Sequence, residues 1–532
     1  MSGEPAFGIP MESPPVEVII AGLPERIADL PEKWAAETPD ALAVSDPNGS
    51  FTYRRFQETI LAAERALADH GVRGGDRVMV VNENGLAVAA LIFAISRCEA
   101  WPVIVNGRLT AREIDAIRDH CTPRRILYTV AVSPEAAAHA ERHGAAPAAI
   151  GGLDGLAIGP FAETEPEPVH DDPTRQIAAL VYTSGTTGAP KGVMLSHRAV
   201  LFTACGPGTQ RPLGPGDYVY SALPVAHVFG LTSTFLRAIY GGAHVHLRPR
   251  FDAADILRAL AEDGVTVFQG VPAMWAKLLE YADTHGIEIE VPHIKSTTIG
   301  GAIVDADLKV RVEEAFGLPL INGYGMTECA STISRSRPKD RGAIVTGGLP
   351  MPGVEVRVVD EQGTDVPRGG TGELWLRTPN IMNGYYRDPV ATAEVLTPDG
   401  WFKTGDLGTQ NEDGDLFIVD RKKEMIIRSG FNVYPAEVEA VLNEHPAVTL
   451  SGVVGRTVAG NEEVIAYVQT APGSAADPQD ILAFAAERLA PYKRPAELHI
   501  LDALPAAATG KILKRTLREM ARSQTREPGG VS

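Results

Sequence analysis

Short apolar runs alternate with segments of helical periodicity in two regions of the chain, residues 70–130 and 215–325. Strands that alternate with helices favour parallel sheets covered by helices on their faces. The pattern therefore predicts an α/β fold with two stacked α/β subdomains. The expected strands are residues 77–81, 103–105, 126–130, 218–222, 265–269, 296–299 and 318–322, and the expected helices are 86–96, 111–121 and 305–316.

The pattern changes after about residue 353 and again after Arg421. Residues 354–359 and 372–377 alternate apolar and polar positions, as antiparallel strands do, with glycine-rich turns between them. Further along, helices are expected from Pro435 and from Asp477, because a proline in the first helical turn suits a helix start. Three parts are expected: a large N-terminal domain with a small β-rich subdomain (1–420), a small α+β C-terminal domain (421–520) and a tail (521–532).

Composition and charge narrow the range of functions. A chain of 532 residues is too long for one compact core, so more than one lobe is expected. The net charge of −18 disfavours nucleic-acid binding, because a polyanion would be repelled. The four cysteines lie far apart without metal or redox spacing, which favours reduced thiols. No signal-peptide pattern and no apolar run of about 20 residues is visible, so we expect a cytoplasmic protein without a transmembrane segment.

A strand-like run at residues 177–182 leads into a segment, 183–192, that reads TSGTTGAPKG. Its glycines allow the backbone to approach a phosphate, and its hydroxyl residues and lysine add hydrogen-bond donors and a positive charge. It is not a Walker A loop, because Pro190 precedes Lys191 and Gly192 follows it. The segment predicts a phosphate-binding loop, and a polar hairpin turn is the alternative. The candidate ligand-binding residues are Thr183, Ser184, Gly185, Thr186, Thr187, Gly188 and Lys191.

The segment 183–192 resembles the phosphate-binding signature of the adenylate-forming superfamily, which includes the acyl- and aryl-CoA synthetases. Four further segments match that family in order and spacing: NGYGMTE at 322–328, TGD at 404–406, DRKKEMIIRSGFNVYPAE at 420–437 and PAAATGK at 505–511. The resemblance covers nearly the whole chain. It implies a ligase that uses ATP to join a carboxylic acid to coenzyme A through an acyl-AMP, with a mobile C-terminal domain.

The chemistry of single residues and the resemblance point to the same nucleotide site. Tyr324, between two glycines, could stack on a purine, and Asp406 could accept hydrogen bonds from both ribose hydroxyls. Glu328 follows a strand end, where parallel sheets bind ligands, and its carboxylate could hold Mg²⁺ on the phosphates. The resemblance implies these roles too, with Thr327 on phosphate and Arg421 as a second ribose contact. It adds Gly301, Ala302, Gly323 and Gly325 to the nucleotide site.

The resemblance assigns four residues to the reacting and moving parts. Lys511 is implied to neutralise charge during adenylation, and His227 to lie beside the substrate carboxylate. Lys423 matches the hinge about which the C-terminal domain rotates, and Gly430 borders the tunnel for the CoA thiol. By composition alone, residues 420–424 are a solvated charge run, and Gly430 is equally well a turn glycine.

The acid is the least determined part of the expected function. The resemblance builds the acyl pocket from Phe229, Ser233, Gly300 and Ile303, a lining without evident charge. This favours an apolar monocarboxylic acid, and the segment 420–437 looks most like fatty acyl-CoA synthetases. The main expectation is a medium- or long-chain fatty acid, and the first alternative is an aryl or cinnamate-type acid. The motifs are also compatible with an enzyme that loads an acyl carrier protein, a luciferase-like monooxygenase or a non-catalytic AMP- or acyl-binding protein.

The resemblance also implies partners. ATP, CoA and the acid are expected as substrates and Mg²⁺ as the metal, and a homodimer is a further expectation. Many relatives are switched off by acetylation of the lysine that matches Lys511, so a lysine acetyltransferase and a deacetylase acting on Lys511 are expected as well. Acetylation would remove the charge of the amine and thereby its phosphate contact.

Overall fold

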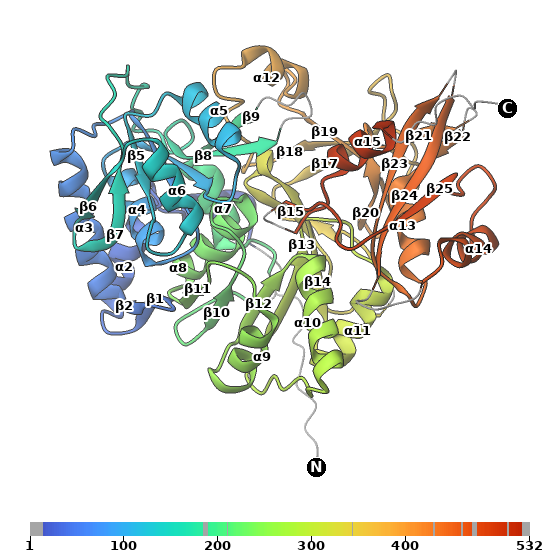
Figure 1. Ribbon diagram of the computed structural model, residues 1–532. Coiled ribbons are helices and arrows are strands. Elements are labelled where there is room, and N and C mark those ends of the chain that lie inside the picture. Colours follow the sequence, from blue (N-terminus) through green and yellow to red (C-terminus); the bar gives the residue numbers. More distant parts are fainter. Residues whose placement is uncertain are drawn as a thin grey trace.

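The computed structural model describes residues 14–184, 190–209, 211–342, 344–428, 431–458, 461–470, 476–507 and 510–523. Figure 1 shows a blue-to-teal lobe, a green-to-yellow lobe beside it, and a smaller orange-to-red unit that carries the C-terminal elements. Two short helices, α1 (Val16–Ala21) and α2 (Asp29–Glu37), precede the first strand. Within the described residues, none of the helices combines the length and the apolar character needed to cross a bilayer.

The first large sheet contains β3 (Arg77–Asn82), β4 (Trp101–Asn106), β5 (Arg125–Tyr128), β6 (Ala146–Ile150), β7 (Leu153–Ile158), β8 (Ile177–Ser184) and β9 (Pro190–Ser196), in the order β6-β7-β5-β3-β4-β8-β9. Its helices are α3 (Tyr53–Asp69), α4 (Leu86–Arg97), α5 (Ala111–Cys121) and α6 (Pro134–Arg142). β3 pairs in parallel with β4 and β5, and all of its residues are buried. At the edge, β8 and β9 form an antiparallel hairpin.

The second large sheet contains β1 (Leu42–Asp46), β2 (Gly49–Thr52), β10 (Tyr218–Ser221), β11 (His244–Leu247), β12 (Val267–Gly270), β13 (Ser296–Gly300), β14 (Leu320–Met326), β15 (Ser331–Arg335) and β16 (Leu349–Pro350), in the order β16-β15-β14-β13-β12-β10-β11-β1-β2. Its helices are α7 (His197–Cys205), η1 (Phe229–Leu236), α8 (Arg237–Gly241), α9 (Ala253–Glu262), α10 (Pro272–His285), α11 (Ala306–Phe316) and the 3₁₀ turn η2 (Thr327–Cys329). β1 joins this sheet by pairing in parallel with β11, a contact that the sequence pattern did not indicate. Asp305, where the expected helix 305–316 begins, caps α11 by accepting hydrogen bonds from the backbone N–H groups of Asp307 and Leu308.

The rest of the chain forms smaller sheets. One antiparallel sheet contains β17 (Glu355–Val359), β18 (Gly372–Arg377), β19 (Phe402–Gln410) and β20 (Leu416–Arg421), with α12 (Pro389–Val395) before β19. The C-terminal unit contains β21 (Ile426–Arg428), β22 (Phe431–Val433), β23 (Val448–Val458), β24 (Asn461–Thr470), β25 (Glu497–Leu501), α13 (Pro435–Asn443), α14 (Pro478–Arg488) and α15 (Lys514–Ser523). The fold class expected from the sequence is therefore confirmed: a large α/β part, a small β-rich sheet and a small α+β unit.

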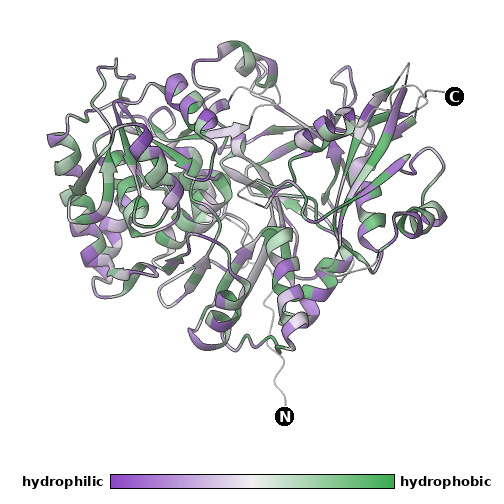
Figure 2. Ribbon diagram, in the orientation of Figure 1, coloured by the Kyte–Doolittle hydropathy of each residue, from purple (hydrophilic) through white to green (hydrophobic). Residues whose placement is uncertain are grey.

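Hydropathy follows this arrangement. In Figure 2 the strands inside the large lobes are mostly green, whereas purple residues gather on the outer helices. All four cysteines are free, with Cys121 and Cys329 buried, as expected for reduced thiols. The connection at residues 159–170 forms neither helix nor strand, in keeping with the proline-rich, acidic sequence there.

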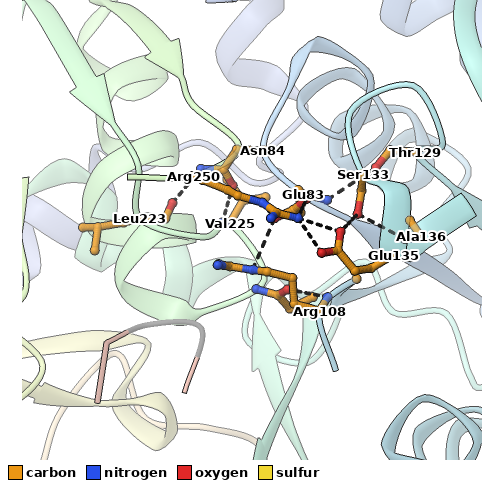
Figure 3. Close-up of polar contacts among 12 residues, drawn as sticks. Glu83, Asn84, Arg108, Thr129, Ser133, Glu135, Ala136, Leu223, Val225 and Arg250 are labelled. Atoms are coloured by element: carbon orange, nitrogen blue, oxygen red, sulfur yellow. Dashed lines mark hydrogen bonds and ion pairs between the residues drawn. The ribbon is translucent and has the colours of Figure 1, made fainter. Parts of the chain in front are cut away.

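Loops from the carboxyl ends of both large sheets meet at a cluster of charged residues (Figure 3). Glu83, directly after β3, is buried and accepts a hydrogen bond of 3.1 Å from Nε of Arg250, which follows β11. Arg108, after β4, lies with its Nε 3.2 Å from the same carboxylate. Arg250 also reaches Glu135 on α6 at 2.6 Å. Two arginines therefore share one buried carboxylate, and the cluster ties the two α/β subdomains together.

Asn84, next to this cluster, joins the subdomains a second time (Figure 3). Its Nδ2 donates to the carbonyl of Leu223, and its Oδ1 accepts from the N–H of Val225, both at 2.9 Å. The Asn84 side chain is almost fully buried. This two-point contact holds the loop that follows β10 and leads to His227.

Candidate active site

The expected phosphate loop lies at the tip of the β8–β9 hairpin. Thr183 pairs with Lys191 across the two strands, so both flanks of the segment are held in register. Gly185, Thr186, Thr187 and Gly188 fall outside the described residues. Lys191 places its Nζ 4.8 Å from the ring centre of Tyr385, a cation–π distance.

Tyr385 connects the phosphate hairpin to the expected metal carboxylate. Its hydroxyl donates a hydrogen bond of 2.8 Å to Oε1 of Glu328. Thr327 and Glu328 follow the end of β14, and Thr327 is buried. Ala330 and Ser331 have positive φ angles of 46° and 101°, so the backbone just after Glu328 is strained, as is common at functional sites. No sequence motif marks Tyr385, because its contacts depend on tertiary packing.

The residues expected to bind the nucleoside form one connected group. The Tyr324 hydroxyl donates to Oδ2 of Asp406 at 2.7 Å, and Nε of Arg421 lies 3.1 Å from Oδ1 of the same carboxylate. Asp406 and Arg421 stand opposite each other on β19 and β20. Burial, followed by the charge of Asp406, raises the pKa of Tyr324 well above its usual value, so the phenol stays neutral. Gly325 is required here, since a Cβ would lie 1.5 Å from the carbonyl oxygen of Ser331.

Lys511 reaches this group from the C-terminal unit. A Cβ built on its neighbour Gly510 would lie 3.2 Å from Cγ2 of Val271, so the lysine loop rests on the segment after β12. The Lys511 side chain reaches solvent, yet desolvation by the surrounding protein lowers its pKa to about 8. The positive charge of Arg421 lowers it further, against the opposite effect of Glu424. The structure therefore brings Lys511 and the nucleoside group together.

The surroundings of His227 keep its imidazole ring neutral. Burial lowers its pKa to about 4, and the positive charge of Lys511 adds to this effect. Its Nδ1 accepts a hydrogen bond of 3.3 Å from the N–H of Phe229. A neutral ring that accepts at Nδ1 carries its proton on Nε2, so His227 can donate to an acid oxygen.

The expected acyl-pocket residues fall into two groups. The ring of Phe229 packs against the backbone at Gly300, where an added Cβ would lie only 3.6 Å from the ring. The same Cβ would lie 3.0 Å from the carbonyl oxygen of Gly323, so Gly323 borders this position too. Ser233 is buried on η1, where its hydroxyl bonds to Ser331 and Thr332 at 2.9 Å each. Gly301 and Ala302 follow β13 at the surface, and Ile303 is 47% exposed. Phe229, Gly300 and Gly323 therefore cluster, and Ile303 faces solvent.

The helix η1 is a π-helix, which the sequence pattern did not predict. Thr232 bonds through its hydroxyl to the carbonyls of Val228 and Ala330, both at 2.7 Å. Inserted π turns occur often at functional sites. Here the π-helix places Ser233 against β15 and Phe229 against Gly300 at the end of β13.

Lys423 lies in the turn between β20 and β21, where the N–H of Glu424 donates to the carbonyl of Arg421 at 2.8 Å. A cavity of about 250 Å³ opens beside this turn, lined by Thr404, Gly405, Arg421, Lys422 and Lys423. Gly430, the expected tunnel glycine, falls outside the described residues. The assignments to hinge, tunnel and acyl pocket therefore stay predictions.

Two family models match the chain. The model of the AMP-binding enzymes covers residues 31–386, and that of the AMP-binding enzyme C-terminal domain covers 437–511. The first match spans the phosphate hairpin, Glu328 and Tyr385. The second ends at Lys511.

Curated proteins and solved structures extend these matches. A feruloyl-CoA synthase from an Amycolatopsis species is 34% identical over 500 residues, which cover 93% of this chain and 99% of that protein. A long-chain-fatty-acid–CoA ligase from Bacillus subtilis is 35% identical over 352 residues, 65% of this chain and 62% of that protein. Among solved structures, the O-succinylbenzoate coenzyme A synthetase of Bacillus subtilis with ATP and magnesium is 27% identical, with a TM-score of 0.77 over 92% of this chain and 98% of that one.

Proposed function

The chain belongs to the AMP-binding enzyme family as an AMP-forming acid–CoA ligase, and we propose that it activates an aryl acid rather than a fatty acid. The observation that carries this proposal is the similarity to a feruloyl-CoA synthase along almost the full length of both chains. The fatty-acid ligase matches only about two thirds of this chain. The proposal therefore replaces the expectation of a medium- or long-chain fatty acid with its first alternative.

The site supports an aryl acid in a second way. Phe229 packs against the backbone at Gly300, so an aromatic wall borders the expected acyl pocket. Aromatic rings pair favourably with one another, by about 0.5–1.5 kcal/mol beyond the area they bury. An aryl acid can use this contact, whereas a flexible alkyl chain loses more conformational freedom for the same buried area.

The residues of this site suit adenylation, the step that makes a carboxylate reactive towards a thiol. A carboxylate does not react with a thiol, because it would have to expel oxide, so the carboxylate first attacks the α-phosphate of ATP and pyrophosphate leaves. The protein has to align the reactants and neutralise the charge that develops on the phosphate oxygens. We assign the neutralisation to Lys511 and the phosphate hairpin. We assign orientation of the acid to His227 through its Nε2 proton.

Magnesium fits the carboxylate at Glu328. Within the described part of the chain, no group of three or more His, Cys, Asp or Glu residues could hold a metal ion. A metal here would be held by one carboxylate with phosphate oxygens and water, which is how Mg²⁺ is commonly bound. Tyr385 occupies Oε1 of Glu328 and leaves Oε2 for this purpose. Bound Mg²⁺ would supply positive charge to the phosphates.

In the second half-reaction the CoA thiolate attacks the acyl-AMP, and AMP leaves. We propose that the C-terminal unit rotates about Lys423 between the two halves, withdrawing Lys511 and presenting the tunnel at Gly430. An exchange of two domain orientations around one site is a common way to separate two chemical steps. Acetylation of Lys511, a homodimer and a cytoplasmic location stay predictions; the first is tested by mass spectrometry of protein from its native cells, with deacetylase treatment.

The decisive experiment compares acids and acceptors. Pyrophosphate and AMP release are measured with feruloyl-, cinnamoyl- and benzoyl-type acids and with octanoic and palmitic acids, each with and without CoA. Aryl acids are expected to give CoA-dependent AMP release with higher kcat/KM than the fatty acids. Higher kcat/KM for a fatty acid would overturn the substrate proposal. Pyrophosphate release with transfer to a carrier protein but not to CoA would favour the carrier-loading alternative, and no release with any acid would favour a non-catalytic binding protein.

A further inference from the structure

Two arginines beside the expected acyl pocket have no hydrogen-bonding or ionic partner among the residues that the structure describes. Arg237 follows η1 directly as the first residue of α8, and Arg335 is the last residue of β15. Burial lowers the pKa of Arg237 to about 10, and burial together with the charge of Arg237 lowers the pKa of Arg335 well below its usual value. Both side chains are half-buried, yet the surrounding protein desolvates both guanidinium groups, and no anion accompanies them among the described residues.

The sheet register places Arg335 on the pocket face. Residues directly opposite each other on neighbouring strands project to the same face of a sheet. Arg335 is opposite Gly323 on β14, and Gly323 is in turn opposite Gly300 on β13. A Cβ on Gly300 would point at the ring of Phe229. Arg335 therefore lies on the face of the sheet that Phe229 covers.

The helix places Arg237 at the same end. Ser233 bonds to Ser331 and Thr332, so η1 runs along β15. Arg237 comes four residues after Ser233, about one helical turn further from His227. Its guanidinium packs against the end of α7, with Nε 3.3 Å from the position of a Cβ on Gly206. Both arginines thus lie at the end of the pocket away from the reacting carboxylate.

Within the described ranges, no carboxylate compensates the charge of this pair. The nearby Arg211 is already paired with Asp217. Burial raises the pKa of the Cys205 thiol to about 12, so this neighbour of both arginines is neutral. Desolvated charges without partners are costly even in half-buried side chains, and they are rarely kept unless something else neutralises them. An anionic ligand between the two guanidinium groups would do so, and arginine forks match the geometry of a carboxylate.

We propose that Arg237 and Arg335 form an anion subsite at the far end of the acyl pocket, and that the acid substrate carries a second carboxylate there. The proposal rests on the proposed function and deepens it: the substrate is an aryl acid with an acidic group at the end opposite the one that reacts. Arg237 comes ten residues after His227, so along a helix their Cα atoms are about 15 Å apart. One aromatic ring with an acidic group at each end fits within that length. The expectation of an uncharged monocarboxylic acid is thereby revised.

The first test uses matched acids. Pyrophosphate release is measured with 4-carboxycinnamate, with its neutral methyl ester at the 4-position, and with cinnamate. The wild-type enzyme is expected to prefer the diacid to the ester by about 100-fold or more in kcat/KM, because a site built to pair a polar group rejects an analogue without it. Arg237→Met and Arg335→Met should each reduce this preference to less than about tenfold. Arg211→Met is the control, since Arg211 is already paired, and it should keep the preference.

The second test measures ligand binding through the unfolding temperature and does not depend on catalysis. Terephthalate, a rigid aryl dianion, should raise the unfolding temperature of the wild-type protein and have little effect on the two arginine variants. Without ligand, Arg335→Met should unfold at a higher temperature than wild type, because an uncompensated charge has been removed. A structural role for Arg335 predicts the opposite shift. Inorganic phosphate is the third arm: if it stabilises the wild type as well as terephthalate does, the pair holds a free anion and the substrate proposal is overturned.

The two proposals can fail separately. If no aryl acid, neutral or charged, supports CoA-dependent AMP release, the proposed function fails. If neutral and doubly charged aryl acids are used equally well, and the arginine variants do not change their ratio, only the anion subsite fails.

Discussion

At the residue scale, the lowered pKa of Lys511 predicts how the rate of adenylation depends on pH. Desolvation and the charge of Arg421 lower the pKa of Lys511 to about 8. The charged form, which neutralises phosphate, therefore predominates below pH 8 and is lost as the pH rises through 8. We expect kcat/KM of pyrophosphate exchange to fall above about pH 8. The Lys511→Arg variant keeps its positive charge at every pH tested, so the fall in kcat/KM above about pH 8 should be absent from it. An unchanged fall in the arginine variant would assign the titration to another group.

Tyr385 is a second residue whose role can be isolated. Tyr385→Phe removes the hydroxyl that bonds to Glu328 and keeps the ring beneath Lys191. The loss of one hydrogen bond to a carboxylate should raise KM for MgATP by about 3- to 10-fold, with little change in kcat. Tyr386→Phe is the matched control, because that neighbouring hydroxyl donates to Glu167 instead. Equal effects of the two variants would show that Tyr385 does not act through Glu328.

Which residues could be predicted from sequence depends on how locally their role is encoded. Asp406, Glu328 and Lys511 stand in short motifs, and the structure brings them to one place. Tyr385, Arg237 and Arg335 stand in no motif, because their importance comes from neighbours far along the chain. Ser233 is expected in the acyl pocket, and the sequence does not show that its hydroxyl bonds to Ser331 and Thr332 on β15. A one-dimensional pattern does not show which partner a side chain finds.

At the scale of secondary-structure elements, local sequence signals predicted where helices begin, but they did not predict which strands pair. The helices expected from Asp305 and Asp477 begin there, and both aspartates cap them, because capping needs only the backbone N–H groups of the next turn. The π-helix η1 was not predicted, and its Thr232 hydroxyl bonds to the carbonyl of Ala330, almost 100 residues further along the chain. β1 forms a local hairpin with β2 that was not predicted, and its parallel pairing with β11, about 200 residues further along, has no local signal.

The loop between β10 and η1 provides the element-scale prediction. Asn84→Ala removes both bonds to this loop, at Leu223 and Val225, and leaves a buried carbonyl without its donor. We expect the adenylation kcat to fall about tenfold with KM for ATP unchanged, since a displaced His227 no longer orients the acid. In a double-mutant cycle, Asn84→Ala should have little further effect in a His227→Ala background.

The control for this cycle is Asn82→Ala. Asn82 is equally buried, but its amide bonds to Val80 and Val105 within the first sheet. Asn82→Ala should lower the unfolding temperature about as much as Asn84→Ala does. Its effect on the adenylation kcat should simply add to that of His227→Ala. If Asn84→Ala is also additive, Asn84 supports the fold and does not position His227.

At the scale of the whole molecule, the site exists only where three parts meet. The phosphate hairpin belongs to the first sheet, Tyr324 and Glu328 to the second, and Lys511 to the C-terminal unit. The order of the motifs indicated that these parts cooperate, but not how they are placed. Placement depends on contacts such as Glu83 with Arg250 between sheets and Gly510 on Val271 between units. These contacts join positions whose sequence separation gives no periodic signal.

The turn at Lys423 decides whether Lys511 can stay in this arrangement. The N–H groups of Glu424 and Met425 both donate to the carbonyl of Arg421, so Lys422 and Lys423 are folded into a tight turn. A proline at 423 would force Lys422 towards extended backbone and would strain this turn. It would also disturb the bond of 2.9 Å from the N–H of Lys422 to the carbonyl of Gly405. Lys423→Pro should therefore disfavour the orientation that the structure shows, in which Lys511 lies beside the nucleoside group.

We expect Lys423→Pro to slow pyrophosphate exchange by at least about tenfold, equivalent to about 1.4 kcal/mol lost from that orientation. Thioester formation from supplied acyl-AMP and CoA should continue, because that step does not need Lys511 in place. Lys423→Ala is the matched control: it removes the same side chain, leaves the backbone free, and should keep both half-reactions. The two half-reactions are measured separately, alongside the unfolding temperature of each variant. Full pyrophosphate exchange in the proline variant would show that the rotation is centred elsewhere, and loss of both half-reactions without a change in unfolding temperature would show that this turn is needed in both orientations.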